Sequence, residues 1–374
     1  MTAELRADAA IVGAGVVGLA VARALARSGR DVVVLEAETA PGRHASGRNS
    51  GVVHAGIHHA TAWLRTRLCV EGRPALYAYC EERGVGHARP GKLVVAPGED
   101  EVPGLLALAA RGRANGVDDL VVLSGAEVRA LEPELRCARG LLSPSTGIVD
   151  PEALVRALRH DAEDSGARIA LSAPVHGGEV GGDGIVLRVG GREPALLHCR
   201  EAVNAAGLGA HAVSRGLDGF PAATVPPSHP SRGHYFVLSG AAPFRRLVYP
   251  LPEAGGLGIH LTLDLGGAAR FGPDASPATG LDHAFDASRL PAFETAVRRW
   301  WPGLPDGALR PGHVGIRARI SAPGAPAADF AVHGPEVHGV RGLVCLYGIE
   351  SPGLTACLAL ADLVVARLDG RAMA

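Results

Sequence analysis

The hydrophobic pattern at the amino-terminal end of the chain predicts a strand, a helix and a second strand in close succession. Residues 8–12 form a short apolar run, residues 19–27 have helical spacing, and residues 31–35 form a second apolar run. Continuous apolar strands are typical of a parallel sheet that is covered on both faces. A strand, a turn, a helix and a strand within about 30 residues form a βαβ unit.

The rest of the pattern predicts further strands of this buried kind and a separate group of alternating ones. Alternation over residues 234–272, with turns at 252–256 and 265–267, is typical of an antiparallel sheet. Residues 177–194 resemble a meander with glycine turns. Other strands are expected at 92–96, 168–171, 173–175, 201–205 and 342–347. Helices are expected over 63–83, 104–115, 126–131, 151–163, 288–300 and 353–367.

These elements predict an α/β protein in which two domains interleave along the chain. A Rossmann-type dinucleotide-binding domain is expected to contain residues 1–84, 146–214 and 312–374. An α+β substrate domain built on an antiparallel sheet is expected over residues 85–145 and 215–311. Each domain is therefore discontinuous in sequence.

Composition narrows the class of protein. The chain has 374 residues, 47% of them hydrophobic, and a formal net charge of -1, which gives no reason to expect general binding to nucleic acid. Its six cysteines form no C-x-x-C pair, so neither a disulfide scaffold nor a zinc site is expected. Because no secretory signal and no apolar run of about 20 residues is visible, we expect a cytoplasmic protein, with peripheral attachment to the inner membrane left open.

The first motif with chemical meaning is Gly13-x-Gly15-x-x-Gly18, which follows the first strand and opens the first helix. Glycines at this spacing permit a tight turn, close approach of the backbone to a pyrophosphate, and close packing of helix on strand. The helix amino terminus then offers free N–H groups to phosphate. Glu36, at the end of the second strand, can accept hydrogen bonds from a ribose. The motif predicts dinucleotide binding.

A second loop indicates which dinucleotide. Residues 42–51 are rich in glycine, serine, arginine and asparagine. A nicotinamide dehydrogenase does not need such a loop after the first βαβ unit, whereas a flavin ring needs backbone donors along one edge. The sequence therefore favours a flavin.

At this loop the chain resembles the L-2-hydroxyglutarate dehydrogenase/oxidase family of FAD-dependent oxidoreductases, within the D-amino-acid-oxidase-like superfamily. The resemblance begins with the loop at residues 46–57 and extends over nearly the whole chain. Its further matching segments are 68–72, 91–96, 145–150, 204–207, 248–250, 257–262, 315–317 and 351–352. It implies a noncovalently bound FAD and oxidation of a small 2-hydroxy acid to the 2-oxo acid. The electron acceptor stays open among oxygen, a quinone and a carrier protein.

The resemblance, together with the βαβ motif, gives a set of residues expected to bind FAD. They come from the first turn, the end of the second strand, the second loop, two later strand ends and the start of the last helix. The set is Gly13, Gly15, Val16, Val17, Gly18, Glu36, Ala37, Ser46, Arg48, Asn49, Ser50, Gly51, Val175, Ala206, Gly207, Arg317, Gly353, Leu354 and Thr355. No metal ligand is expected.

Oxidation of a 2-hydroxy acid needs a base for the hydroxyl proton and a cation for the carboxylate. His54, after the flavin loop, and His260, expected inside an apolar strand, are the candidate bases, and the choice between them stays open. Arg317 suits the carboxylate because its planar fork binds both oxygens. Tyr249 and Tyr235 are candidate hydrogen-bond donors to the substrate, with packing as the alternative role for each.

Three departures from the family pattern make the substrate less certain than the fold. His58-His59 stands where the family has aromatic residues, Arg232-Gly233 replaces Lys-Gly, and residues 348–352 differ from the family's Asn-Ala-Pro-Ser-Pro. An amino acid or amine oxidase of glycine, sarcosine or D-amino-acid type is the alternative activity, and a flavin-binding protein without turnover is a third. Lys92, the only lysine of the chain, is either a compact cation near the substrate or a chance survivor.

Overall fold

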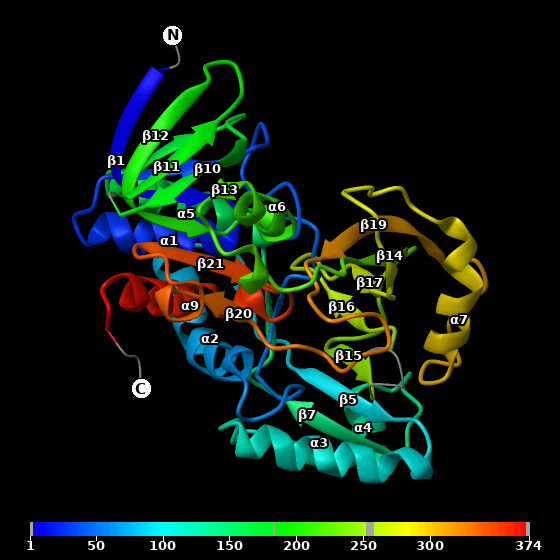
Figure 1. Cartoon of the computed structure of the whole chain (residues 1–374). Helices are drawn as coiled ribbons and strands as arrows, with labels where there is room; N and C mark the ends of the chain where they lie inside the picture. The colour runs from blue at the N-terminus through cyan, green and yellow to red at the C-terminus, as the bar shows by residue number, and fades with distance from the viewer. Residues whose placement is uncertain (1–2, 183, 252–257, 372–374) are drawn as a thin grey trace. The chain divides into compact units, whose positions relative to one another are not determined.

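The computed structural model of this protein describes residues 3–182, 184–251 and 258–371 (Figure 1). The chain divides into two compact units. Unit 1 contains residues 1–47, 151–230 and 317–374, and unit 2 contains residues 48–150 and 231–316. Both units are discontinuous in sequence. The expected bounds of the cofactor and substrate domains stay a prediction, since a compact unit is defined by packing and not by ligand.

Unit 1 is built on a mixed sheet. Within the described residues its strand order is β13-β10-β11-β12-β1-β2-β9, with β21 also pairing with β12 and β20 pairing with β21. Its central strands β1, β2, β9, β12 and β21 are parallel, as the apolar runs predict. The strands are β1 (Ala3–Val12), β2 (Val32–Leu35), β9 (Arg168–Ala170), β10 (Val175–Gly181), β11 (Gly184–Val189), β12 (Ala195–Asn204), β13 (Leu217–Asp218), β20 (Ala331–His333) and β21 (Leu343–Tyr347).

Strand β1 is longer than its apolar run predicts. It begins at Ala3, because its exposed first half pairs in register with β12 from Ala3↔Ala195 onward. Only the last four residues of β1 are buried. A hydrophobic pattern shows the part of a strand that lies in the core, whereas backbone pairing continues into solvent.

In unit 1, helix α1 contacts both α5 and α9 (Figure 1). Eight of the twelve residues of α1 are buried, so α1 is an internal helix of this unit. The helices are α1 (Val16–Arg27), α5 (Pro151–Asp164), α6 (Ala210–Arg215), α8 (Pro335–His338) and α9 (Gly353–Leu368), with short 3-10 turns at Gly207–Gly209 and Ala222–Thr224.

A buried polar network fixes the end of β12 in unit 1. The side-chain Nδ2 of Asn204 donates to the carbonyl oxygen of Ala210 at 2.8 Å and to Oγ of Ser214 at 2.9 Å. The hydroxyl of Tyr347 donates to the same Ser214 oxygen at 2.6 Å. Buried polar groups need such partners, so Asn204 joins β12, α6 and β21 and has a structural role.

Unit 2 is built on a sheet in the order β18-β14-β17-β16-β15-β5-β7-β6, with β19 pairing with β14, and on a small sheet in the order β3-β8-β4. In the large sheet the pair β15–β5 is parallel, whereas β15–β16, β16–β17 and β5–β7 are antiparallel. Its strands are β5 (Lys92–Ala96), β6 (Val121–Ser124), β7 (Arg139–Ser143), β14 (Ser231–Leu238), β15 (Leu247–Pro250), β16 (Leu261–Leu263), β17 (Ala269–Phe271), β18 (Ser276–Pro277) and β19 (Leu309–Arg317). The small sheet contains β3 (Val52–Val53), β4 (His87–Ala88) and β8 (Gly147–Val149).

The helices of unit 2 follow the predicted positions within a few residues. The helix expected over 288–300 is shorter, because a 3-10 turn at Ala287–Arg289 precedes it. The turn expected at 252–256 lies outside the described residues. The helices are α2 (Leu64–Arg83), α3 (Val102–Ala114), α4 (Gly125–Leu131) and α7 (Leu290–Arg298), with a second 3-10 turn at Glu99–Glu101.

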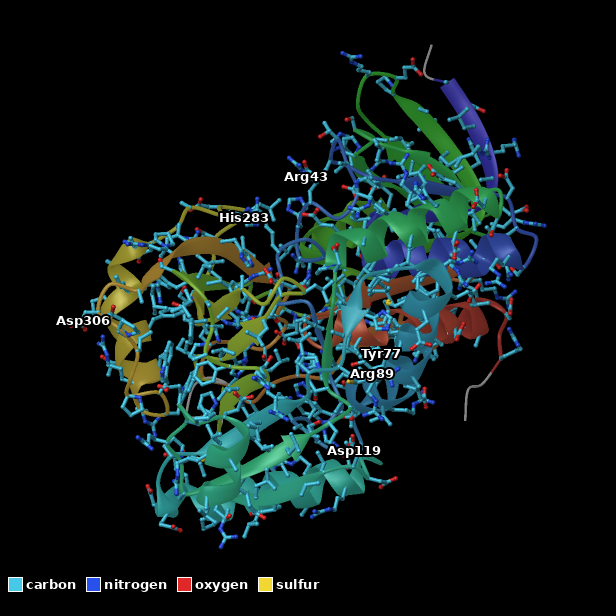
Figure 2. The ribbon with its side chains drawn as sticks, turned by 180° about the vertical axis from the view of Figure 1, so that it is seen from behind. Arg43, Tyr77, Arg89, Asp119, His283 and Asp306 are labelled. Carbon is cyan, nitrogen blue, oxygen red and sulfur yellow. The ribbon has the colours of Figure 1, made fainter. Side chains whose placement is uncertain are left out.

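Tyr77 of α2 holds the segment that leads into β8. Its hydroxyl donates to the carbonyl oxygen of Ser145 at 3.1 Å, and the guanidinium of Arg89 lies 4.0 Å from its ring centroid (Figure 2). A Cβ at Gly147 would stand 2.2 Å from the Tyr77 hydroxyl. Only glycine therefore fits there, which gives the 145–150 motif a packing role.

Within the described residues, no helix combines the length and the apolar character that crossing a membrane requires. The six cysteines are buried free thiols. In that same part of the chain, no group of three or more His, Cys, Asp or Glu side chains is placed to hold a metal ion.

Candidate active site

The glycine motif of unit 1 forms a turn between β1 and α1 that leaves no room for side chains. Gly13 has φ +102°, and a Cβ there would stand 2.7 Å from the carbonyl oxygen of Ala205. A Cβ at Gly18 would stand 2.0 Å from the carbonyl oxygen of Gly13. Both distances are too short for real atoms. The motif is therefore required by backbone packing, and it brings the turn against the end of β12, where Ala206 and Gly207 follow.

Backbone N–H groups of this turn face oxygen acceptors. The amide of Ala14 donates to Oε2 of Glu36 at 2.6 Å, and the amide of Val16 donates to Oγ of Ser46 at 2.9 Å. The Glu36 carboxylate is buried and also accepts from the amide of Glu38 at 2.9 Å. Both of these N–H groups have acceptors within the protein, and the feature of the turn that favours a phosphate is the positive end of the α1 dipole.

The residues of this turn fit the adenosine diphosphate part of a dinucleotide. The three glycines would let the backbone approach a diphosphate, Ser46 would add a hydroxyl, and Glu36, at the carboxyl end of β2, would offer an acceptor to a ribose hydroxyl; these roles stay predictions. We call the turn at residues 13–18 together with Glu36, Ser46, Ala206 and Gly207 the dinucleotide cradle.

Other expected cofactor ligands occupy separate positions, and their contact with FAD stays a prediction. Val17 lies in the first turn of α1, Ala37 is exposed after Glu36, and Val175 is the first residue of β10. Arg317 is the last residue of β19 and is half-buried. Helix α9 begins with Gly353, Leu354 and Thr355 as expected.

The loop expected to contact the flavin crosses from one compact unit to the other along the chain, with Ser46 in unit 1 and Arg48 in unit 2. Oδ1 of Asn49 accepts from the amide of Gly51 at 2.7 Å, which closes a tight turn after Arg48. A Cβ at Gly315 would stand 2.3 Å from the carbonyl oxygen of Arg48, so the loop backbone lies directly on β19. The contribution of Arg48, Asn49, Ser50 and Gly51 to flavin binding stays a prediction.

In unit 2, strand register brings Lys92, Tyr249 and His260 to one face of the sheet. Val248 of β15 pairs with Leu261 of β16, which sets Tyr249 opposite His260. Leu247 pairs with Lys92 of β5, so Tyr249 is the diagonal neighbour of Lys92 on the same face. Strand β16 begins only at Leu261. The expectation that His260 lies within the strand is therefore wrong: it immediately precedes the strand, although its carbonyl oxygen accepts from the amide of Gly272.

The resulting contacts are close. The rings of Tyr249 and His260 stack with centroids 3.5 Å apart and an interplanar angle of 12°. Nζ of Lys92 lies 4.7 Å from the Tyr249 ring centroid and 3.1 Å from Nε2 of His58. The ring of His58 also stacks on the ring of Tyr249, with centroids 6.2 Å apart. We call His54, His58, His59, Lys92, Tyr249 and His260 the basic cluster.

The segment that carries His54, His58 and His59 is held by its backbone carbonyls. Nδ2 of Asn115 donates to the carbonyl oxygens of Gly56 at 2.7 Å and His59 at 3.1 Å. Sγ of Cys69 donates to the carbonyl oxygen of His54 at 3.5 Å. Gly56 has φ +103° and packs on Val70, so this bend requires glycine. The loop is therefore preorganised by residues that carry no chemistry of their own.

Burial controls the charges in the basic cluster. It holds the pKa values of His54 and His58 well below the ordinary value, and the nearby Lys92 lowers them further. It also lowers the pKa of His59 to about 3 and that of Lys92 to about 7, and it raises the pKa of Tyr249. At neutral pH the three histidines are neutral and can accept a proton or a hydrogen bond.

Reasoning from the sequence missed His58 and His59 as cluster members. It counted them only as departures from the family pattern, although two adjacent histidines directly after the glycine-rich loop are a signal that could have found them. The ring of Tyr235 stacks on His313 with centroids 4.3 Å apart. Burial lowers the pKa of His313 to about 4.

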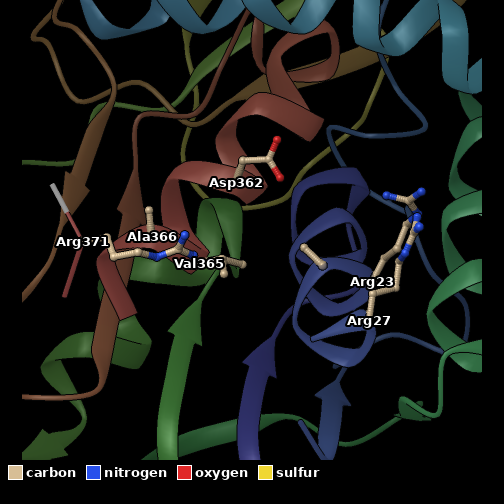
Figure 3. A pocket seen from close by; sticks show the side chains of 7 residues that line it. Arg23, Arg27, Asp362, Val365, Ala366 and Arg371 are labelled. Carbon is tan, nitrogen blue, oxygen red and sulfur yellow. The ribbon is translucent and has the colours of Figure 1, made fainter. Parts of the chain in front are cut away.

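A depression of about 530 Å³ in unit 1 lies between α1 and α9 (Figure 3). Its lining residues belong neither to the dinucleotide cradle nor to the basic cluster. Arginines and one carboxylate line it, and burial raises the pKa of that carboxylate, Asp362. No residue expected to bind cofactor or substrate is among them. The lining residues are Arg23, Ala24, Arg27, Asp362, Val365, Ala366 and Arg371.

Comparison with known proteins places the chain in a family. The family model described as FAD dependent oxidoreductase (DAO) matches residues 8–367. A mitochondrial L-2-hydroxyglutarate dehydrogenase of Arabidopsis thaliana is 41% identical over 400 residues, covering 96% of this chain and 83% of the relative. The L-2-hydroxyglutarate dehydrogenase of Escherichia coli (strain K12) is 31% identical over 274 residues, covering 72% of this chain and 64% of the relative.

Solved structures agree on the fold. An L-alpha-glycerophosphate oxidase from Mycoplasma pneumoniae, with FAD bound, superposes with a TM-score of 0.86 at 25% identity and covers 97% of this chain and 95% of its own. A glycine oxidase from Geobacillus kaustophilus gives 0.83 at 23% identity, covering 99% and 96%. These matches confirm the predicted fold class, a Rossmann-type FAD domain with an α+β substrate domain. The chain is an enzyme that belongs to the family of FAD-dependent oxidoreductases and is a homologue of L-2-hydroxyglutarate dehydrogenases.

Proposed function

We propose that this enzyme oxidises a small 2-hydroxy dicarboxylic acid of the L-2-hydroxyglutarate type to the corresponding 2-oxo acid. The observation that carries the proposal is the 41% identity to a protein named L-2-hydroxyglutarate dehydrogenase over 96% of this chain. The geometry supports it, because the dinucleotide cradle suits the cofactor and the basic cluster suits proton removal from an anionic substrate.

The dinucleotide cradle binds the diphosphate and ribose of FAD without a covalent bond. Backbone amides at the start of α1 and the Ser46 hydroxyl would donate to phosphate oxygens, and Glu36 would accept from a ribose hydroxyl. Bound FAD supplies a hydride acceptor for the hydrogen on the substrate's Cα.

A histidine of the basic cluster takes the proton of the substrate hydroxyl, while the hydride leaves Cα and the C–O bond becomes a carbonyl. His260 is held by stacking on Tyr249, and His54 is kept neutral by burial, so each is able to accept a proton. Arg317 pairs with the carboxylate next to the hydroxyl through two parallel N–H groups. Tyr249 donates a hydrogen bond to the substrate.

The test is an anaerobic titration of the purified enzyme with 2-hydroxy acids and 2-amino acids, followed by loss of flavin absorbance. We expect L-2-hydroxyglutarate to bleach the flavin and 2-amino acids not to. Bleaching by glycine, sarcosine or D-amino acids alone would contradict the proposal and would favour an amine oxidase. Reoxidation by oxygen, a quinone or a carrier protein, added after bleaching, identifies the electron acceptor.

A further inference from the structure

Lys92 is the only lysine of this chain, in which all other members of the 37 basic Lys and Arg residues are arginines. It is the first residue of β5, and its side chain is fully buried. An ammonium is a compact point charge, whereas a guanidinium is wide and planar. A buried ammonium is costly unless it is paired with an opposite charge or hydrogen-bonded.

The partners of Lys92 in the structure are not anions. Nζ lies 3.1 Å from Nε2 of His58 and 4.7 Å from the centre of the Tyr249 ring. Among the described residues, no carboxylate lies within ion-pair distance of Nζ. A buried cation without a carboxylate is costly, and burial accordingly lowers the pKa of Lys92 to about 7.

His58, the neighbour of Lys92, also has a buried polar group without an anionic partner among the residues described. When Lys92 carries its proton it can only donate, so Nε2 of His58 accepts and the His58 proton is on Nδ1. Nδ1 of His58 is buried and has no hydrogen-bond partner within the described part of the chain. In the part of the chain that the structure describes, the Lys92 ammonium therefore has only a neutral imidazole as its acceptor, and the N–H of that imidazole has no acceptor of its own.

The other titratable groups around Lys92 carry no negative charge that could serve. They are His54, His58 and His59 from the loop after β3, Cys69 of α2, and Tyr249 of β15. Burial raises the pKa of the Cys69 thiol to about 12 and also raises the pKa of Tyr249, so both are uncharged at neutral pH. His54 and His58 are partly exposed, whereas Lys92 is fully buried. The region is suited to an anion that comes from outside the protein.

We propose that Lys92 binds the second carboxylate of the substrate, the one remote from the hydroxyl, and so selects dicarboxylic over monocarboxylic 2-hydroxy acids. This inference rests on the proposed function. It makes Lys92 a specificity-determining residue, whereas the proton of the hydroxyl goes to His54 or His260.

The experiment compares wild type with Lys92→Met on L-2-hydroxyglutarate and on L-2-hydroxypentanoate, which has the same chain length and no second carboxylate. A hydrogen bond to a charged group contributes about 1.5–3 kcal/mol, which corresponds to roughly tenfold to hundredfold in affinity. We expect Lys92→Met to lose that much of the preference in kcat/KM for the diacid, through KM, with the monoacid unchanged. Val95→Ala, on the opposite face of the same strand and also fully buried, should keep the preference.

A binding measurement separates this inference from the proposed function. Glutarate, which has two carboxylates and no hydroxyl, should bind wild type with uptake of a proton above pH 7, measured by calorimetry in two buffers of different ionisation enthalpy. Lys92→Met, and Lys92→Gln as a second variant with a polar end, should bind it more weakly and without proton uptake. Wild type that oxidises neither acid would contradict the proposed function, and the glutarate result would still decide the role of Lys92.

Two results would overturn the inference. One is an unchanged ratio of kcat/KM for the two acids in Lys92→Met. The other is an equal loss of kcat for both acids, because that would make Lys92 the proton acceptor and leave the second carboxylate elsewhere.

Discussion

The dinucleotide cradle and the basic cluster accomplish recognition in opposite ways. The cradle is built mainly of backbone, with no side chain at three glycines that follow one another within six residues. The basic cluster uses the side chains of His54, Lys92, Tyr249 and His260, which come from segments far apart in the chain. A site made of backbone depends on space, whereas a site made of buried side chains depends on charge and register.

The largest effect should come from filling the space of the cradle. In Gly18→Ala the new Cβ would meet the carbonyl oxygen of Gly13 at 2.0 Å, so the turn has to open. We expect protein that purifies without flavin colour and does not recover it when FAD is added. Gly181→Ala, at an exposed strand position with nothing within 4 Å, is the matched control and should stay yellow. A yellow Gly18→Ala enzyme would show that the cradle does not depend on space.

A smaller loss, confined to chemistry, should follow from changing the basic cluster. Replacing the proton acceptor, in either His260→Asn or His54→Asn, should slow flavin reduction by about 10²–10⁴-fold with FAD content unchanged. Stopped-flow absorbance under anaerobic conditions measures the rate for each variant and so decides between the two histidines. If both variants reduce as fast as wild type, neither histidine is the base.

The buried charge of Lys92 in the basic cluster should lower the free energy of unfolding at the pH values where the ammonium is protonated. Its pKa is about 7 in the folded enzyme and near 10.5 when unfolded, so the unfolded chain binds more protons between these values. The free energy of unfolding of wild type should therefore rise with pH relative to Lys92→Met, by up to about 1.4 kcal/mol per pH unit from about pH 7 to 10. Urea unfolding at several pH values measures this slope, and parallel curves for the two proteins would contradict it.

The smallest effect should come from the support of the histidine loop. Asn115→Ala removes the hydrogen bonds to the carbonyl oxygens of Gly56 and His59 and should lower the free energy of unfolding by about 1–2 kcal/mol. Flavin reduction should slow only a few-fold. Arg113→Ala, in the last turn of α3 near Asn115, removes a hydrogen bond to the carbonyl oxygen of Leu120 and is the control. An Asn115→Ala enzyme as stable as this control would show that the loop does not need the amide.

The contrast between the cradle, which comes mostly from one local segment, and the basic cluster, which comes from distant segments, also explains which features the sequence could predict. The Gly13–Gly18 turn, Glu36 and the interleaved α/β organisation were predictable, because each depends on local spacing along the chain. The stacking of Tyr249 on His260 was not, because it follows from the pairing of Val248 with Leu261. Register between separate strands is set by the packing of the whole sheet, and no local pattern contains it.

Lys92 shows the intermediate case. Its solitary occurrence in an arginine-rich chain was visible in the sequence, but its burial and its contact with His58 were not. Composition could therefore mark the residue without giving its role. The expected position of His260 inside a strand was wrong for a related reason: apolar neighbours indicate burial, whereas the strand begins where ladder pairing begins.

The most direct measurement of the central claim is the anaerobic titration of oxidised flavin in the purified enzyme with L-2-hydroxyglutarate. The account predicts stoichiometric loss of the flavin absorbance and formation of the 2-oxo acid in equal amount. A flavin that stays oxidised with this acid and bleaches with a 2-amino acid would contradict it.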